Sequence, residues 1–594
     1  MTQKEIPFDL TEIFSSIEDS NIATAFEKMN AKVDLICKTY QGKIKELDAQ
    51  GLLQLLKDSE EYYVQLNEMN NYAGFSFYGN MMDEKAQQLY NKHNTNSSLN
   101  RKKLTFIELE IGSLLKAKPE LITDPLLTNY KHYLEKINAE VPHRLSEIEE
   151  QLIIEKDQFG VDAWEELRNK WASTREFEIE IEGKKEKFHI GEFMKYRISE
   201  NRSIRKLATE IVYKDVAGDG EIYSFALRNI FNDWVTVSKR RKYKKPIGAS
   251  LISNEITQDV LNSMFKTIKE NVNLYRRALK IKAKLLKLPK LAAYDFQAPL
   301  PGIKHESYSW EDAQKIIKTS FSKFDPEILE IVEDMFSRNH IDAVPRKGKT
   351  PGAFCSTWYG GKSTFILQSF NDDLDSVQTL AHELGHSIHA YLMVKEQTIF
   401  NTWFPAVAAE TASFFGELLL IEELLSKMKT KEEKIDILLK LVSRIGHVIF
   451  GLTPMYWFET EIYEAIERGE FLDSKTITNY WVTSRDKIYG DTVEWFEDVN
   501  SSWSLVPHYY MSNFRYYNYP YIFAQLFVYA LYQQYLKEKE EFIPKFKKIL
   551  AAGGSMSPKD LGEIVGLDIT KPEFWELGMK QYEYFLLELE KLVK

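Results

Sequence analysis

The run TLAHELGHSIHAYL contains His382, Glu383 and His386 in the pattern H-E-x-x-H. On a helix, residues four positions apart lie on one face, so both imidazoles can point at one metal ion. Glu383, next to the first histidine, can then reach a water molecule on that ion and take its proton. The alternative is a helix face whose two histidines are paired with neighbouring side chains. These residue types at this spacing favour a zinc-dependent hydrolytic centre over that alternative.

The third metal ligand must lie elsewhere in the sequence. Metzincins continue the motif as H-x-x-G-x-x-H, but the corresponding positions here are His389 and Leu392, which excludes that class. The other common solution is a carboxylate from a second helix, which leaves the fourth position of the metal open. Glu410 lies in the alanine-rich run PAVAAETASFFGELLL, whose small residues would let this helix approach the metal helix closely. We therefore predict one Zn²⁺ per chain, bound by His382, His386 and Glu410.

Further polar residues accompany the predicted ligands. Glu410, Ser413 and Glu417 fall on one stripe of an otherwise apolar helix, and buried carboxylates need a metal or a hydrogen-bonding partner. The alternative is that both glutamates face solvent. His389 shares the stripe of the two ligand histidines, so it is either a hydrogen-bond donor to a ligand or a core histidine. We predict that Glu417 and His389 support the ligands without binding the metal.

The elements that must position these residues are mostly helices. A helical period runs from about residue 10 to 156, and the chain after Asp373 is helical to its end, with breaks near residues 402–405, 490–507 and 553–558. Residues 174–190 alternate with period two around Gly183, which predicts a hairpin. Residues 338–371 are rich in Pro and Gly, and residues 363–370 are the best strand candidate among them. The sequence predicts a mainly α, zincin-type metallopeptidase with a small β element beside the H-E-x-x-H helix. We expect an N-terminal helical region at residues 1–200 and a catalytic domain at residues 201–594.

Composition narrows the function class further. The chain has 77 Lys+Arg against 88 Asp+Glu, a formal net charge of -11, which argues against a nucleic-acid partner. Its two cysteines provide no disulfide framework, and we do not interpret Cys355 as a nucleophile. No stretch reaches about 18 uninterrupted apolar residues, and residues 1–14 lack the pattern of a signal peptide. We expect a cytoplasmic protein without a membrane partner, whose oligomeric state the sequence does not determine.

Several motifs together are similar to one known family. HELGH, followed by a glutamate 28 residues after the first histidine in the run ETASFFGE, resembles the oligoendopeptidase F family, which is related to thimet oligopeptidase. The loop RKGKTPGAF and the late segment VPHYYMSNFRYYNYPYIF match this family as well. These pieces span residues 346–523, a little under a third of the chain. The resemblance implies a zinc endopeptidase that cleaves short peptides in a channel between helical lobes.

The late segment provides candidates for contacts with the substrate. A buried phenol or imidazole can be aimed at the negative charge that develops on the scissile carbonyl. By resemblance, His508 is the first candidate, with Tyr516 or Tyr517 next, and we expect Tyr510 and Tyr519 to contact the substrate. The alternative for each tyrosine is core packing, which is the usual role of an aromatic-rich helix start.

The predicted strand offers a second route to the substrate. An extended peptide can pair with an exposed strand edge beside the metal helix, which would use Phe365, Ile366 and Leu367. The Gly-rich loop at residues 348–361 is either a lid over the substrate or a simple surface connection.

Two other functions stay open at this point. A helical zinc carboxypeptidase would need a cation such as Arg515 or Arg346 to bind the terminal carboxylate of the substrate. A catalytically silent peptide-binding protein could keep the same fold. The intact Glu383 argues against the silent protein, because binding alone needs no general base. The endopeptidase is therefore our leading hypothesis.

Overall fold

A computed structural model of the protein describes residues 9–302 and 307–594, so the first residues of the stretch considered for a signal peptide lie outside it. The chain forms two compact units, each assembled from three separate stretches. Unit 1 comprises Met1–Val141, His305–Lys427 and Gln534–Asp568, and unit 2 comprises Pro142–Lys304, Met428–Gln533 and Ile569–Lys594. Residue 200 lies inside one of these stretches. The predicted N-terminal region and catalytic domain, divided at residue 200, stay a prediction.

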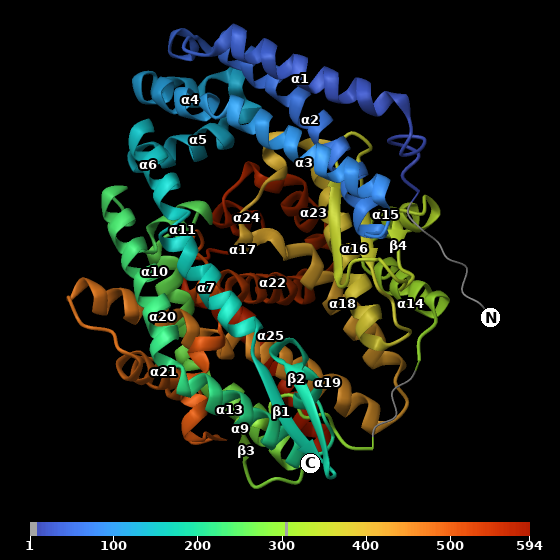
Figure 1. Ribbon diagram of the computed structural model, residues 1–594. Coiled ribbons are helices and arrows are strands. Elements are labelled where there is room, and N and C mark those ends of the chain that lie inside the picture. Colours follow the sequence, from blue (N-terminus) through green and yellow to red (C-terminus); the bar gives the residue numbers. More distant parts are fainter. Residues whose placement is uncertain (1–8, 303–306) are drawn as a thin grey trace. The chain divides into compact units, whose positions relative to one another are not determined.

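Unit 1 begins with a bundle of amphipathic helices. These are α1 (Ser20–Tyr40), α2 (Ala49–Gly79), α3 (Glu84–Leu104), α4 (Phe106–Ala117) and α5 (Lys131–Glu140). Aspartate side chains accept backbone N–H groups at the starts of α1, α2 and α3, which satisfies groups that a helix leaves unpaired. α1 packs against α2 and α3 through buried residues that recur every three or four positions: Ile22, Phe26, Met29, Val33 and Ile36 (Figure 1).

The rest of unit 1 surrounds a small sheet. Its helices are α14 (Trp310–Ser322), α15 (Pro326–Ser337), α16 (Leu374–Glu396), α17 (Ala406–Ala409), α18 (Thr411–Lys427), α23 (Phe542–Ala552) and α24 (Pro558–Ile564). The strands are β4 (Ile341–Asp342), β5 (Ala353–Trp358) and β6 (Ser363–Gln368), in the order β4-β6-β5. β6 pairs with β4 in parallel and with β5 antiparallel, and α16 packs against β5 and β6. The predicted strand at residues 363–370 and its position beside the H-E-x-x-H helix are confirmed.

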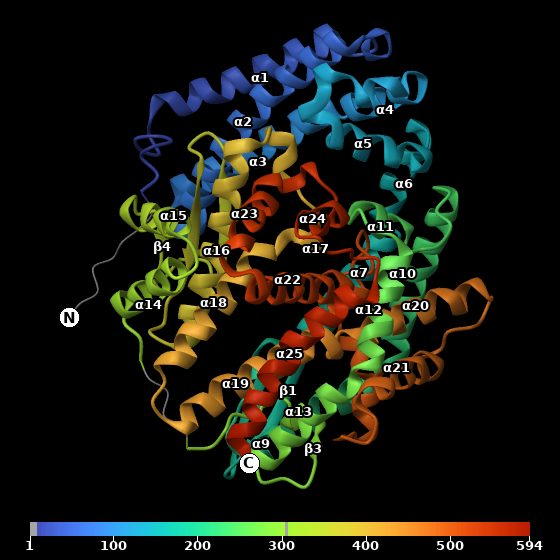
Figure 2. The ribbon, with the colours of Figure 1, turned by 180° about the vertical axis from the view of Figure 1, so that it is seen from behind.

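Unit 2 is also mostly helical. Its helices are α6 (Glu147–Asp157), α7 (Val161–Ser173), α8 (Phe193–Arg197), α9 (Arg202–Gly218), α10 (Gly220–Arg240), α11 (Gly248–Ser253), α12 (Gln258–Glu270), α13 (Val272–Leu285), α19 (Lys431–Gly446), α20 (Thr453–Glu467), α21 (Ser474–Tyr489) and α25 (Pro572–Val593). α25 packs against α12, α13 and α19 (Figure 2). The chain leaves unit 2 within α22 (Tyr519–Glu538). Strands β3 (Leu291–Ala292) and β7 (Val493–Glu494) form a short parallel pair.

The predicted hairpin is present in unit 2. β1 (Glu176–Ile181) and β2 (Lys184–His189) are antiparallel, with Phe177 opposite Phe188. Glu182 and Gly183 form the two-residue turn, and both have positive φ angles, 51° and 78°, as a turn that matches the twist of the strands requires.

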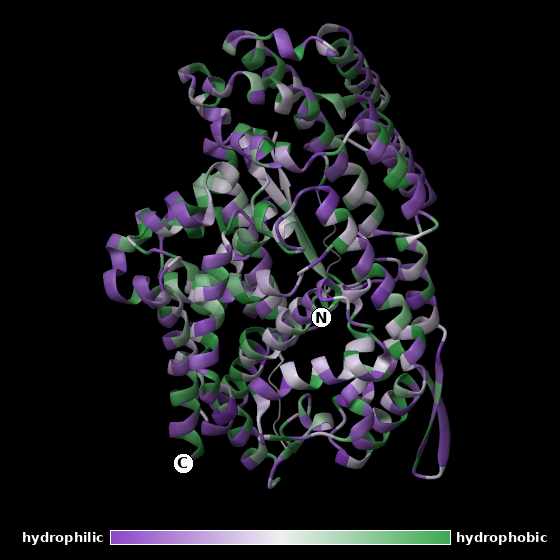
Figure 3. Cartoon of the chain, turned by 90° about the vertical axis from the view of Figure 1, so that its left-hand side faces the viewer, coloured by the Kyte–Doolittle hydropathy of each residue, from purple (hydrophilic) through white to green (hydrophobic). Residues whose placement is uncertain are grey.

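The fold class follows from these elements. Most helices carry both hydrophilic and hydrophobic residues (Figure 3), as expected where one face packs inward. The prediction of a mainly α protein with a small β element beside the H-E-x-x-H helix is confirmed. The channel between helical lobes stays a prediction. Within residues 9–302 and 307–594, no helix combines the length and the apolar character needed to cross a membrane.

Candidate active site

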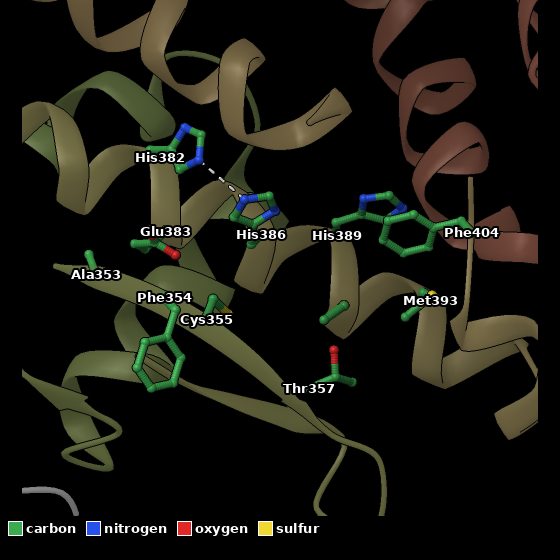
Figure 4. A pocket seen from close by; sticks show the side chains of 11 residues that line it. Ala353, Phe354, Cys355, Thr357, His382, Glu383, His386, His389, Met393 and Phe404 are labelled. Atoms are coloured by element: carbon green, nitrogen blue, oxygen red, sulfur yellow. Dashed lines mark hydrogen bonds between the residues drawn. The ribbon is translucent and has the colours of Figure 1, made fainter. Parts of the chain in front are cut away.

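α16 carries the H-E-x-x-H motif as a regular helix. The Asp373 side chain accepts a hydrogen bond from the Ser376 backbone N–H at 2.7 Å, which caps the start of the helix. One turn apart on the same face, His382 and His386 bring their Nε2 atoms to within 3.2 Å of each other (Figure 4). The spacing that the sequence predicted to gather two imidazoles therefore does so.

Close packing between α16 and α18 depends on a glycine in the motif itself. A Cβ atom on Gly385 would lie 2.5 Å from the Ala412 carbonyl oxygen and 2.5 Å from the Ser413 Cα atom, too close for any side chain. The alanines predicted to allow this approach contribute Ala412, but Gly385 is the residue that the contact requires. The sequence contained one indication of this close contact: a glycine inside a helical pattern, where it costs stability.

Glu410 lies where the chain turns from α17 into α18. We expected one continuous helix through this residue, but the backbone breaks there, and Ser413 Oγ donates a hydrogen bond to Glu410 Oε2 at 2.6 Å. Glu410 Oε2 lies 3.3 Å from His382 Nε2 and 3.4 Å from His386 Nε2. The break thus turns the carboxylate toward the two imidazoles.

The three facing atoms have the spacing of a metal site. A tetrahedral zinc ion with ligands at about 2.0–2.1 Å separates neighbouring ligand atoms by about 3.3–3.4 Å. The observed edges of the triangle are 3.2, 3.3 and 3.4 Å. His382, His386 and Glu410 are the one group of this kind within the described parts of the chain. The residues present therefore fit a tetrahedral metal ion with one position left open.

Glu417 lies behind the first histidine. Its Oε1 atom is 2.8 Å from His382 Nδ1. A carboxylate at this nitrogen holds the proton on Nδ1, so Nε2 keeps its lone pair free for a metal. α18 supplies both Glu417 and the close contact at Gly385, and the two helices therefore orient the imidazole together.

Burial and neighbouring charges set the protonation of the two remaining carboxylates. Burial raises the pKa of Glu383, and the nearby imidazoles of His386 and His382 oppose this effect. Burial would also raise the pKa of Glu410, but hydrogen bonds and charges from His386, His382 and Ser413 outweigh it and lower that pKa to about 2. Glu410 is thus ionised near neutral pH, whereas the raised pKa of Glu383 makes it a better proton acceptor.

These residues face a cavity of about 370 Å³ in unit 1. Its walls come from β5, from α16 and from Phe404, and His382, Glu383 and His386 line it together (Figure 4). A volume of this size lies within the range of ligand-binding pockets.

The predicted supporting role of His389 is wrong. Within the described residues its Nδ1 atom is buried and makes no hydrogen bond, and the ring lies flat against Phe404 at 4.5 Å. Three residues after His386, the side chain is carried farther along α16, away from the ligands. His389 nevertheless lines the same cavity.

The predicted substrate contacts on the strand also need correction. Phe365, Ile366 and Leu367 are 0% exposed and lie on β6, the central strand of the sheet. A strand with neighbours on both sides has no edge to offer a peptide. The edge strands are β4 and β5, and of these β5 lines the cavity, with Phe354 and Cys355.

The far end of β5 is anchored from α2. The side-chain amides of Asn67 and Asn71 each donate a hydrogen bond to the Thr357 carbonyl oxygen at 3.0 Å, and Asn67 Oδ1 accepts one from the Tyr359 backbone N–H. The edge near Thr357 is therefore occupied, and the half-buried part of β5 around Cys355 is the part beside the cavity. Burial raises the pKa of the Cys355 thiol to about 12, which makes it a poor nucleophile.

The late aromatic segment belongs to unit 2, where most of its predicted residues are in the core. Tyr510 and Tyr519 are 0% exposed, and the Tyr519 hydroxyl is bonded to Ser250 and Asn254. Neither tyrosine has a surface for a substrate, so their predicted contacts are wrong. Tyr516 is buried between Tyr456 and Tyr463.

His508 and Tyr517 differ from the other residues of this segment. Their rings stack at 4.7 Å, and both side chains are half-buried rather than enclosed. Of the predicted oxyanion donors, these two keep exposed surface. Their role stays a prediction.

The site and the fold together define a class: helical metallopeptidases with an H-E-x-x-H helix and a glutamate from a second helix. The chain matches peptidase family M3 over residues 194–581 and Oligopeptidase F over residues 116–177. Oligopeptidase PepF of Bacillus subtilis is 28% identical over 595 residues, which cover 98% of this chain and 87% of that protein.

Solved structures show the same fold. The crystal structure of oligoendopeptidase-F from Enterococcus faecium has a TM-score of 0.69 at 21% identity and covers 96% of this chain and 99% of that chain. A crystal structure from Chlamydophila abortus has a TM-score of 0.89 at 21% identity and covers 99% and 98%. The chain therefore belongs to peptidase family M3. The predicted family and the predicted class of enzyme, an endopeptidase, are confirmed.

Proposed function

We propose that this endopeptidase cleaves internal bonds of short peptides with one zinc ion held by His382, His386 and Glu410. The observation that carries the proposal is the triangle of donor atoms with edges of 3.2, 3.3 and 3.4 Å. Three like-spaced atoms of two imidazoles and an ionised carboxylate suit zinc, which prefers nitrogen and oxygen ligands in a tetrahedron. When bound, zinc polarises the scissile carbonyl and lowers the pKa of a water molecule toward about 7.

In this mechanism Glu383 moves the proton. Its carboxylate lines the cavity beside both ligand histidines, where it can accept a proton from the attacking water. The same group then gives that proton to the amine that leaves. Burial of Glu383 helps the first step, because a carboxylate with a raised pKa is a better base near neutral pH.

The substrate is held in an extended form along β5. This strand is one of the two edge strands of the sheet, and it contributes Ala353, Phe354 and Cys355 to the cavity wall. Backbone hydrogen bonds to a strand edge recognise a peptide without demanding a particular sequence. This supports a role in cleaving peptides of varied sequence.

The test compares the wild type with Glu383→Gln on an internally quenched peptide of about ten residues, blocked at both ends. We expect internal cleavage by the wild type and a rate about 10²–10⁴-fold lower for the variant, since general-base catalysis contributes that much. Both proteins should contain about one zinc per chain, because Glu383 is not a ligand. Glu396→Gln, an exposed position on the same helix, is the matched control.

Each contrary result has a definite meaning. Undiminished cleavage by Glu383→Gln would remove the general base from the mechanism. Loss of zinc in that variant would make Glu383 part of the metal site. A zinc-loaded wild type that trims only unblocked peptides would favour the carboxypeptidase.

A further inference from the structure

The cavity continues beyond the catalytic residues along α16. His389, Ala390 and Met393 follow His386 on the wall of the same cavity, with Phe404 and Thr357 facing them (Figure 4). We call these five residues the side arm of the cavity. A helix rises about 1.5 Å per residue, so His389 lies about 4.5 Å and Met393 about 10 Å farther along the axis than His386.

The offset of the side arm along α16 can be compared with the spacing of residues in a peptide substrate. Successive residues of an extended peptide are about 3.3 Å apart. The axial offset of about 4.5 Å between His386 and His389 is comparable to the spacing between neighbouring residues of an extended peptide. The side arm can therefore receive the side chain of a residue next to the scissile bond.

The walls of the side arm determine which side chain fits. Ala390, Met393 and Phe404 are apolar, and the polar groups among them are the His389 imidazole and the Thr357 hydroxyl. The acidic residue on the cavity wall, Glu383, lies at the catalytic end. Such walls suit an aromatic ring that carries one polar atom at its tip, and they offer no partner for the full charge of a lysine or arginine.

One ring nitrogen of His389 is buried and has no hydrogen-bond partner among the described residues. The residue is 5% exposed, and its Nδ1 atom makes no hydrogen bond to any described residue. Buried polar atoms in proteins are hydrogen-bonded in the great majority of cases, so an exception calls for a missing partner. Burial lowers the pKa of His389 to about 3, so the ring is neutral at pH 7 and offers one donor and one acceptor.

Stacking fixes the orientation of this imidazole. The rings of His389 and Phe404 are 4.5 Å apart and nearly parallel, at 11°. A ring held in this way presents its polar edge at low entropic cost. A phenolic hydroxyl can form a hydrogen bond with either nitrogen of the ring, because it both donates and accepts.

We propose that His389 is a specificity-determining residue that binds the hydroxyl of a tyrosine next to the scissile bond, so that tyrosine is preferred over phenylalanine there. The inference rests on the proposed function, because it assumes cleavage at the metal site. It differs from a purely structural role for His389, which would affect both substrates equally.

The test uses end-blocked, internally quenched peptides that differ only in having Tyr or Phe on one or the other side of the cleaved bond. For one of the two positions, we expect the wild type to show a kcat/KM about tenfold higher for Tyr, the effect of one net hydrogen bond. In His389→Phe, which keeps an aromatic ring against Phe404, the ratio should fall to about one. His389→Gln, which keeps a donor and an acceptor, should retain part of the preference.

Two controls separate the possible failures. Glu396→Gln lies exposed on the same helix and should keep the wild-type ratio. Binding of the two peptides to Glu383→Gln, followed by fluorescence, should show the same tenfold difference in Kd without turnover. Equal rates for Tyr and Phe in the wild type, or an unchanged ratio in His389→Phe and His389→Gln, would overturn the inference alone. Failure of the zinc-loaded wild type to cleave any of the peptides would overturn the proposed function and the inference with it.

Discussion

In unit 1, α16, α18 and the turn that precedes α18 bring four polar side chains together, whereas the segment at residues 507–521 in unit 2 places most of its tyrosines in a core. His382, His386, Glu410 and Glu417 are linked by contacts of 2.8 to 3.4 Å. Tyr510, Tyr516 and Tyr519 are each at most 3% exposed. A tyrosine ring gains by burial, because it is largely apolar and its hydroxyl can be satisfied locally. Carboxylates and imidazoles lose hydration on burial, so they gather only where a partner compensates.

Polar residues in a sequence therefore differ in how much they predict. Two glutamates on an apolar helix stripe predict a partner, because burying them otherwise costs too much. Several tyrosines in a row predict little beyond packing. Substitutions of single polar groups in each region test this difference.

The largest effect should come from Glu410→Gln. Removing the charge of a metal ligand should lower both zinc affinity and kcat/KM by about 1,000-fold, measured by chelator competition and by peptide cleavage. Glu422→Gln, an exposed position on α18, should leave both unchanged. If Glu410→Gln binds zinc as tightly as the wild type, the triangle of donor atoms is an ordinary hydrogen-bonded cluster.

A smaller effect should separate the tyrosines of unit 2. If Tyr517 is an oxyanion donor, Tyr517→Phe should lower kcat by about 100-fold with little change in KM. Tyr510→Phe should lower kcat by less than about threefold, because that ring is enclosed beneath the Arg168 guanidinium, 4.6 Å from its centre. Equal losses in the two variants would show that burial does not distinguish them.

The helix of the H-E-x-x-H motif, α16, was predictable because the pattern that indicates it lies within one short stretch of sequence. The residues from His382 to His386 need only one helical turn, and Glu417 needs only the period of α18. The hairpin at β1 and β2 was predictable for the same reason. Each of these depends on spacing within one element or on a two-residue turn.

What the sequence could not provide depends on pairing between distant segments. The pattern of STFILQSF predicts a strand, but its central place in the sheet depends on β4 and β5. Only the order β4-β6-β5 shows that the edges belong to these two strands. The anchoring of Thr357 by Asn67 and Asn71 joins residues almost 300 positions apart. A helical wheel places His389 on the ligand stripe, yet the ring turns to Phe404 instead.

The Gly-rich loop shows the same limit. Its composition suggested a lid, but Lys349 donates hydrogen bonds to Asp342, to the Val344 carbonyl oxygen and to the Gln368 carbonyl oxygen. Arg346 also pairs with Asp342, a buried carboxylate. The start of the loop is therefore fastened to the sheet, which the glycine count alone did not indicate.

A still smaller effect should come from Glu417→Gln. The amide oxygen can still accept the Nδ1 hydrogen of His382, but the negative charge is lost. Zinc affinity should fall by about tenfold, at the low end for a residue that orients a metal ligand. Glu417→Ala, which removes the acceptor as well, should lose up to about 100-fold. If Glu417→Ala keeps full affinity, Glu417 does not support the metal site.

The smallest effect on activity, less than twofold, should come from Glu459→Gln in unit 2. Burial raises the pKa of Glu459 to about 7, despite a 2.8 Å hydrogen bond from the Tyr516 backbone N–H and the charge of Arg515. Between pH 4.5 and 7 the folded protein therefore holds a proton that the unfolded chain has released, so stability falls as the pH rises through this window. The loss should be about 3 kcal/mol, from 1.36 kcal/mol per pKa unit. Glu459→Gln is neutral at every pH, so the stability of this variant in thermal unfolding should fall less between pH 5 and 8 than that of the wild type.

The matched control is Glu467→Gln, an exposed position on α20, which should show the same fall in stability as the wild type. Identical pH profiles for the wild type and Glu459→Gln would mean that this carboxylate is hydrated, and that the core around Tyr516 is less closed than its burial indicates.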